Sequence, residues 1–321
     1  MKKTLVLLMA LVLLISITGC GRQSIGEKVR PSGANREETP LVTLTDSLNR
    51  TVTIEKTPER IVSLAPSNTE ILFALGLGGK VMGVTKYCDF PAEAGSKPQI
   101  GGFSDPNLEK ILARQPDLVL ATEKDQEMIA ALGKQGIDVL AVSPKTVASV
   151  LENIKMVGKA TGASAAADTV VSGLQKRIDA VTAKVQSVPA NKRPKVFYEL
   201  WPEPLTTAGS GTFIDDLIKL AGGVNVAGDA GKGYPEYSLE MLLAENPDVL
   251  INSYGHGKGN PAKEDIKARK GWGALNCVKN DRIYTVNADL VNRSGPRIVE
   301  GLEAFAKAIH PELFSKHEGK Q

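Results

Sequence analysis

The chain has 321 residues, of which 42% are hydrophobic and 23% charged, and its formal net charge is +3. This composition excludes a disordered chain and a protein with many membrane spans. The small net charge gives no global field for binding nucleic acid. At about 100–200 residues per domain, the length favours two lobes with a core each.

The start of the chain has the pattern of a removable leader. A positively charged beginning precedes an almost unbroken apolar run over residues 4–17, shorter than the about 20 residues that a membrane span needs. Small residues then precede Cys20, which resembles the bacterial lipobox, in which the cysteine receives a diacylglycerol. We expect a lipoprotein signal peptide over residues 1–19 and lipidation of Cys20. The alternative is an uncleaved anchor helix, and both place the protein on the extracytoplasmic face of the cell membrane.

Residues 20–41 hold few apolar side chains and several Gly, Pro and charged residues. Such a segment cannot bury enough surface to order itself, so we predict a flexible tether. Two further cysteines, Cys88 and Cys277, lie in the body of the chain, and the sequence leaves open whether they form a disulfide.

Beyond the tether, short strand-like segments alternate with helical ones. Several strands are almost continuously apolar, which favours parallel sheets covered by helices on both faces. The first two strands, over 42–46 and 51–54, form a predicted hairpin. Further predicted strands cover residues 60–64, 81–85, 117–121, 138–142, 195–200, 248–253 and 282–287, and predicted helices cover 68–76, 163–187, 212–221, 261–269 and 295–309.

Two of the helices have specific signals. Ser67 and Glu70 have capping-box spacing, which predicts a helix start near Asn68. The helix over 163–187 carries apolar side chains at spacings of three and four and is followed by prolines. We therefore predict an N-terminal α/β lobe over 42–162, an interlobe helix over 163–190, a C-terminal α/β lobe over 191–311 and a polar tail over 312–321.

An internal repeat supports two lobes with a common plan. Residues 107–120 and 238–251 match in a helix, loop and strand pattern. Each copy begins with a good N-cap and places a glutamate, Glu109 or Glu240, in the first turn. Taken alone, both glutamates could serve only to stabilise the helix ends.

Catalytic and metal signatures are weak. The chain has no G-x-S-x-G elbow or phosphate-binding loop, and a hydrolase using Ser67 or Ser210 would lack a paired base. The three histidines are His256, His310 and His317; their positions do not suggest a metal centre, so we predict no metal site.

Three stretches resemble a known family: residues 60–91, 101–121 and 288–311. They are similar to the class III substrate-binding proteins of bacterial ABC importers, which bind cobalamin, haem or ferric siderophores. The similarity extends over about residues 42–311, and the Tyr-Cys-Asp-Phe-Pro motif that begins at Tyr87 is most similar to the cobalamin-binding branch. The resemblance implies an α/β fold of two Rossmann-like lobes joined by one long helix, with a ligand cleft between them and no enzyme activity.

The resemblance also implies ligand-binding side chains. Aromatic residues would line the cleft from both lobes, and an acid and an arginine four residues apart would contact the polar rim of the ligand. They are Tyr87 and Phe103 in the N-terminal lobe, Trp201 and Tyr234 in the C-terminal lobe, and Asp289 with Arg293. The alternatives are core packing for the aromatic residues and a surface ion pair for Asp289 and Arg293.

In this family one glutamate of each lobe docks onto the paired permease subunits, and the matching residues are Glu109 and Glu240. The resemblance therefore implies a permease dimer with its ATPase subunits as partners, and a cobalamin-like corrinoid as ligand. The alternative ligand is haem or a ferric siderophore, for which Tyr87 could ligate iron and Arg293 could meet an acidic group. We expect no cofactor beyond this ligand and no nucleic-acid partner.

Overall fold

The computed structural model describes residues 41–254 and 262–315. The predicted signal peptide, Cys20, His256 and His317 lie outside the described residues. The chain divides into two units, residues 1–39 and 40–321, and the description below concerns the second unit. None of the helices in the described ranges has the length and apolar character that a membrane crossing requires.

The N-terminal lobe is built on four parallel strands in the order β4, β3, β5, β6. All four were predicted. An antiparallel hairpin precedes them, as expected, and its turn has Asn49 in the left-handed region at φ 58°. The strands are β1 (Val42–Thr45), β2 (Thr51–Ile54), β3 (Ile61–Ser63), β4 (Val81–Gly83), β5 (Leu118–Ala121) and β6 (Asp138–Ala141), and the helices are α2 (Pro66–Ala74), α3 (Leu108–Leu112), α4 (Gln126–Gly133) and α5 (Val147–Ala160).

The C-terminal lobe has a mixed sheet of five strands. Strands β11, β10, β7 and β9 run parallel, and β8 forms an antiparallel hairpin with β7. The strands are β7 (Lys195–Pro202), β8 (Leu205–Thr207), β9 (Val224–Asn225), β10 (Val249–Asn252) and β11 (Ile283–Thr285). The helices are α7 (Phe213–Leu220), α8 (Leu239–Glu245), α9 (Lys263–Lys267), α10 (Asn276–Lys279), α11 (Ala288–Asn292), α12 (Ile298–Ile309) and α13 (Pro311–Phe314). The last helix occupies the start of the predicted polar tail.

Each sheet is covered by helices on both faces because successive strand residues point to opposite sides. In β5, Val119 packs with α3 and α4, whereas Leu118 and Leu120 pack with α2 and α5. In β7, Phe197 packs with α8, α9 and α10, whereas Val196 packs with α7 and α12. The prediction of buried parallel strands is therefore confirmed.

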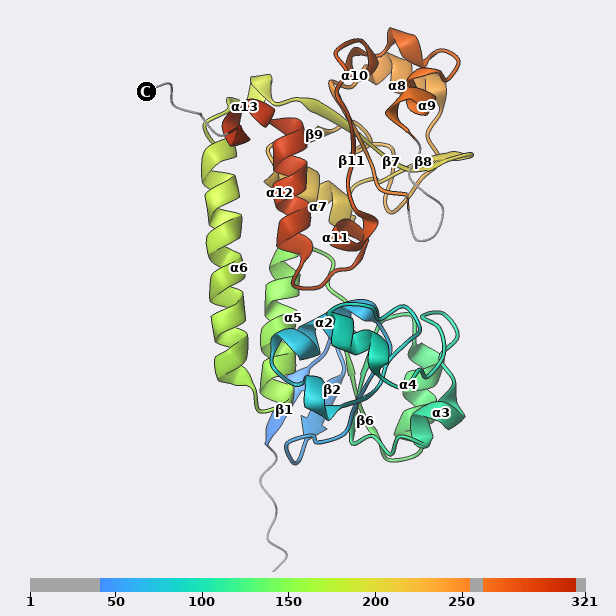
Figure 1. Ribbon diagram of the computed structural model, residues 1–321, viewed down its shortest axis with the longest axis vertical. Coiled ribbons are helices and arrows are strands. Elements are labelled where there is room, and N and C mark those ends of the chain that lie inside the picture. Colours follow the sequence, from blue (N-terminus) through green and yellow to red (C-terminus); the bar gives the residue numbers. More distant parts are fainter. Residues whose placement is uncertain (1–40, 255–261, 316–321) are drawn as a thin grey trace, which may run out of the picture. The chain divides into compact units, whose positions relative to one another are not determined.

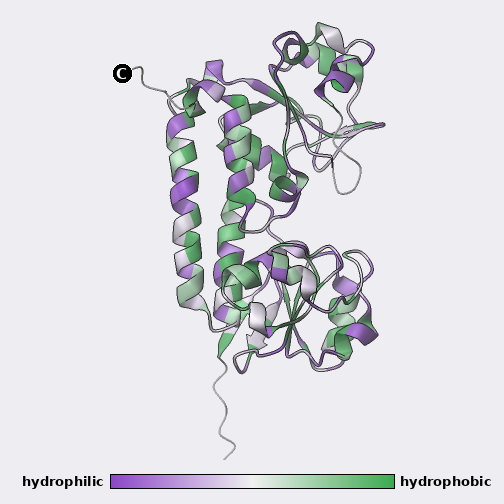
Figure 2. Ribbon diagram, viewed as in Figure 1, coloured by the Kyte–Doolittle hydropathy of each residue, from purple (hydrophilic) through white to green (hydrophobic). Residues whose placement is uncertain are grey.

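One long helix connects the lobes. Helix α6 (Ser164–Val185) packs against α5 of the first lobe and α12 of the second, and Figure 1 shows it alongside both. Figure 2 shows that hydrophilic and hydrophobic patches alternate along α6, as expected for a helix with one face on the core. The buried side chains of α5, α6 and α12 belong to a single apolar cluster with both sheets. The two lobes therefore share part of one core.

Two expectations for the helices were wrong. Helix α2 begins at Pro66, with Ala65 as N-cap and no side-chain cap, so Ser67 and Glu70 do not form a capping box. The carboxylate of Glu70 instead accepts hydrogen bonds from Arg297 of the other lobe. In addition, no helix was predicted in the segments that form α4, α5, α10, α11 and α13.

The repeat is confirmed as the same local structure in both lobes. It forms α3 with β5 in the first lobe and α8 with β10 in the second. Gln115 and Asn246 occupy equivalent loop positions with φ of 49° and 46°. The aspartates that follow, Asp117 and Asp248, both accept backbone N–H groups at the start of the neighbouring strand segment. Asp117 and Asp248 thus make equivalent hydrogen bonds in the loops before β5 and β10.

Candidate ligand cleft

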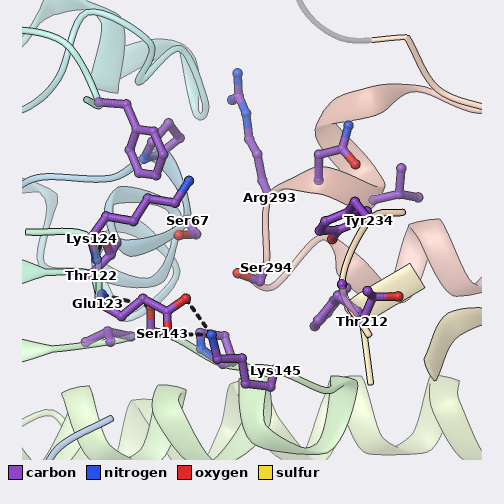
Figure 3. Close-up of a pocket in the computed structure, with 18 of the residues that line it drawn as sticks. Ser67, Thr122, Glu123, Lys124, Ser143, Lys145, Thr212, Tyr234, Arg293 and Ser294 are labelled. Carbon is purple, nitrogen blue, oxygen red and sulfur yellow. Dashed lines mark hydrogen bonds and ion pairs between the residues drawn. The ribbon is translucent and has the colours of Figure 1, made fainter. Parts of the chain in front are cut away.

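A cavity of about 880 Å³ is lined by both lobes. Its N-terminal wall comes from residues that follow β3, β4, β5 and β6. Its opposite wall comes from the start of α7, the loop containing Tyr234, and the end of α11 with the loop after it. Figure 3 shows Ser67, Glu123 and Lys124 across the cavity from Thr212 and Tyr234. The carboxyl ends of parallel strands are the usual place for a ligand in open α/β sheets.

Three of the predicted aromatic residues line this cavity. Tyr87 and Phe103 belong to the N-terminal wall, and Tyr234 belongs to the opposite wall. Tyr87 is 45% exposed and Tyr234 is 51% exposed, so core packing does not account for them. Partial burial raises the pKa of Tyr234. Its hydroxyl, like that of an ordinary tyrosine, is neutral at pH 7 and can donate a hydrogen bond.

The loops after β5 and β6 place charged groups in the cavity. Lys145 forms an ion pair with Glu123, which Figure 3 marks. The Lys124 ammonium lies 5.0 Å from the ring centre of Phe103, within the range of a cation–π contact. These side chains were not predicted, because nothing in the linear sequence shows that the two loops face one cavity.

Arg293 also lines the cavity, but its guanidinium is held by carboxylates. Nη1 donates to Oδ1 of Asp89 at 2.5 Å, and Nε lies 3.0 Å from Oδ1 of Asp289. The side chain of Arg293 is only 6% exposed. The alternative of a surface ion pair is therefore wrong for Arg293, and its main contact joins the two lobes.

A second arginine strengthens this connection. Arg297 donates two hydrogen bonds to Glu70, at 3.0 and 2.6 Å, and its guanidinium lies 3.9 Å from the ring centre of Phe90. Burial raises the pKa of Glu70, whereas the hydrogen bonds and charge of Arg297 oppose that rise. The hydrogen bond from Arg293 lowers the pKa of Asp89 despite its partial burial. We call Glu70, Asp89, Arg293 and Arg297 the interlobe ion cluster.

Two predicted ligand residues are not among those that line the cavity. Trp201 lies near the end of β7, where its Nε1 donates to the carbonyl of Glu203 and its ring packs edge-on against Tyr254. Asp289 lies in the first turn of α11 and contacts Arg293. The structure thus groups Tyr87, Phe103, Tyr234 and Arg293, and leaves these two beside the cavity.

The two repeat glutamates lie at equivalent, exposed positions. Glu109 is in the first turn of α3 and Glu240 in the first turn of α8, with Asn107 and Ser238 capping the helices through their side chains. Neither carboxylate forms an ion pair or hydrogen bond with another side chain in the part of the chain that the structure describes. Both remain accessible to another protein.

The structure can be compared with three alternatives: a serine hydrolase, a metal site and a disulfide. His310 is buried, with Nε2 3.2 Å from the carbonyl oxygen of Gly222, and it forms no hydrogen bond with Ser67 or Ser210. Among residues 41–254 and 262–315, no three His, Cys, Asp or Glu side chains are grouped to hold a metal ion. Cys88 and Cys277 are buried, free thiols, and Cys88 contacts the hydroxyls of Thr69 and Thr85.

The family model and the similar proteins of known sequence all point to a substrate-binding protein. Residues 61–290 match the family model described as periplasmic binding protein. The chain is 36% identical over 308 residues to an uncharacterised ABC transporter substrate-binding lipoprotein of Bacillus subtilis, covering 94% of this chain and 95% of the relative. It is 30% identical over 248 residues to the vitamin B12-binding protein of Vibrio cholerae, and the match covers 76% of this chain and 87% of that relative.

A solved structure shows a similar fold. The crystal structure of a possible iron-binding, periplasmic solute-binding protein from Staphylococcus epidermidis has 34% identity and a TM-score of 0.69, and the match covers 79% of this chain and all of that one. The two α/β lobes, the connecting helix and the cleft agree with this similarity. The chain therefore belongs to the periplasmic binding protein family and is an ABC-transporter substrate-binding protein, which binds a ligand rather than converting it.

Proposed function

We propose that this protein is lipid-anchored through Cys20 on the extracytoplasmic face of the cell membrane, and that it captures a cobalamin-like corrinoid for a permease dimer with its ATPase subunits. Residues 1–19 would be the signal peptide and residues 20–41 the lipidated cysteine and tether. The N-terminal lobe would extend over 42–162, the interlobe helix over 163–190, the C-terminal lobe over 191–311 and the tail over 312–321.

The observation that carries the ligand class is the cleft cavity. Its volume of about 880 Å³ is near the upper end of the about 300–1,000 Å³ that small-molecule sites span. Tyr87 and Tyr234 present aromatic surface from opposite walls, and serine and threonine side chains line the same cavity. A corrin ring is broad and mostly apolar with amides at its edge, so it suits aromatic faces with a few polar groups. The similarity to a vitamin B12-binding protein supports this choice.

The ligand set would be Tyr87, Phe103, Trp201, Tyr234, Asp289 and Arg293. Tyr87, Phe103 and Tyr234 are supported by their place on the cavity walls. For Arg293 we propose a limited role at the ligand edge, because its guanidinium is already engaged with Asp89. Trp201 and Asp289 would contact the ligand only with a change in the cleft, such as closure around it.

Haem or a ferric siderophore is the second candidate. The similarity to a possible iron-binding protein favours it, and the exposed hydroxyl of Tyr87 could ligate iron as a phenolate. The raised pKa of Tyr234 makes that second tyrosine a poorer phenolate donor at pH 7.

Calorimetric titration of the purified protein with cyanocobalamin, haemin and ferrichrome tests the ligand class. We expect binding of cyanocobalamin alone, and a more than tenfold loss of affinity in the double variant Tyr87→Ala with Tyr234→Ala, because two aromatic faces are removed. An unchanged thermal unfolding curve shows that this variant folds. Binding of haemin with no response to cyanocobalamin would overturn the corrinoid assignment in favour of the second candidate.

A further inference from the structure

Some of the charged side chains on the cavity walls form ion pairs with other side chains of the protein, whereas one does not. Among the described residues, four with charged side chains line the cavity: Glu123, Lys124, Lys145 and Arg293. Lys145 is paired with Glu123, and Arg293 contacts Asp89 and Asp289. Lys124 has no carboxylate partner within the described ranges. Of the described cations that line the cavity, Lys124 is therefore the one without a carboxylate partner in the same ranges.

Hydrogen bonds within its loop set the backbone position of Lys124, and its side chain is exposed to the cavity. The backbone and hydroxyl of Thr122 both donate to the Asp125 carboxylate at 2.7 Å, which closes the turn that contains Lys124. The backbone of Glu123 donates to Ser143 in the next loop. The Lys124 ammonium then lies over Phe103, and Figure 3 shows the side chain extending along the cavity wall. The turn thus places the backbone of Lys124 at the cavity, and the contact with Phe103 places its ammonium on the cavity wall.

We propose that Lys124 is a specificity residue that binds a single negative charge on the ligand. A lysine ammonium is a compact donor that pairs well with phosphate or carboxylate oxygens. The attraction strengthens when a ligand fills the cavity and excludes water. The hydroxyl of Ser67, which Figure 3 shows on the same wall of the cavity as Lys124, provides a further donor to the same anionic group.

This inference rests on the proposed function for the identity of the anion. In cobalamin the group is the phosphodiester of the nucleotide loop, which carries one negative charge. Cobinamide has the same corrin ring but no nucleotide loop and therefore no phosphodiester. The two compounds differ in the feature that Lys124 would recognise, so the site would favour the complete vitamin over its precursor.

Calorimetric titration with cyanocobalamin and dicyanocobinamide tests the role of Lys124. We expect Lys124→Gln to weaken cyanocobalamin binding by about tenfold, the effect of losing one charge-assisted hydrogen bond, and to leave dicyanocobinamide binding within twofold. Added salt should weaken cyanocobalamin binding to the unaltered protein more than to the variant. The matched control is Lys184→Gln. Lys184 lies on α6, outside the cavity lining, and its ammonium is 4.8 Å from the ring centre of Phe314 on α13.

The outcomes separate the two proposals. An equal loss for both corrinoids, no loss for either, or the same loss in Lys184→Gln would overturn the role of Lys124 while leaving corrinoid binding intact. If the unaltered protein binds haemin but neither corrinoid, the proposed function fails and haemin becomes the probe. The propionates of haemin then supply the anionic group, so a tenfold loss in Lys124→Gln supports the inference and an unchanged affinity overturns it.

Discussion

At the scale of single residues, the main difference between expectation and structure is Glu70. Its spacing from Ser67 is that of a capping box, yet its side chain is 2% exposed and accepts two hydrogen bonds from Arg297. A local hydrogen bond was expected, and a contact between residues far apart in the sequence replaced it. A buried carboxylate is retained only when a cation or several donors compensate for its lost hydration.

Arg297→Ala should destabilise the protein by about 3–5 kcal/mol, because it leaves the Glu70 carboxylate buried without its main partner. Without that partner the pKa of Glu70 should rise further. A carboxyl group whose pKa is higher in the folded state binds protons preferentially there, so part of the lost stability should return as the pH falls from 7 to 4. Denaturant unfolding at several pH values measures both effects.

The control for this prediction is Arg177→Ala. Arg177 forms a two-pronged ion pair with Glu303, but the two side chains are 42% and 31% exposed. Solvent screening should limit its contribution to about 1 kcal/mol or less. An equal loss of unfolding free energy in Arg297→Ala and Arg177→Ala would contradict this role of Glu70. So would a loss of unfolding free energy in Arg297→Ala that does not depend on pH.

At the scale of elements, the close contact between α5 and α6 organises the connection of the lobes. Gly158 of α5 faces Ala167 of α6, and a Cβ atom at Gly158 would lie 2.5 Å from the Cβ of Ala167. Real side chains cannot approach so closely, so the two helices pack at this separation only because residue 158 is glycine. Helix propensity alone would favour alanine at this position.

Gly158→Ala should therefore lower stability by about 1–2 kcal/mol, since overpacking exceeds the gain in helix propensity. Gly173→Ala on α6 is the matched control, because nothing lies within 4 Å of its Cβ position and the residue is exposed. That change should leave stability equal or raise it by up to about 1 kcal/mol. Thermal unfolding of both variants decides the matter, and a stabilised Gly158→Ala protein would show that the helices are not in tight contact.

At the scale of the whole molecule, the lobes are held by more than one connection. The apolar cluster continues through α5, α6 and α12 into both sheets, and the interlobe ion cluster adds charged contacts beside the cavity. A large hinge opening would expose part of this shared core to water. We therefore expect only a modest change of the cleft on ligand binding.

The repeat makes a prediction about docking at this scale. If Glu109 and Glu240 meet equivalent basic sites on a permease dimer, the double variant Glu109→Arg with Glu240→Arg should abolish ligand uptake by cells while ligand affinity stays within twofold. Both residues are exposed in the first turns of short helices, so the folded structure should tolerate the change.

Two other exposed glutamates serve as the control. Glu127 is in the first turn of α4 and Glu264 in the first turn of α9, one in each lobe. Reversing both charges changes the net charge by the same amount and also acts in the first turn of two helices, but at positions outside the repeat; it additionally removes the ion pair between Glu264 and Lys267. Uptake should persist in that control, and undiminished uptake in the Glu109 and Glu240 variant would exclude the docking role.

The sequence by itself determined every strand except β8 and β9, most helices and the duplication of the lobes, because apolar periodicity and repeat similarity are local properties of the chain. It also predicted Tyr87, Phe103 and Tyr234 at the cleft through family resemblance. Only the tertiary structure decided that Glu70 pairs with Arg297, that Asp89 pairs with Arg293, and that no carboxylate among the described residues pairs with Lys124. Those facts depend on distances between segments far apart in the sequence, and the energy of a charge depends on which groups surround it after folding.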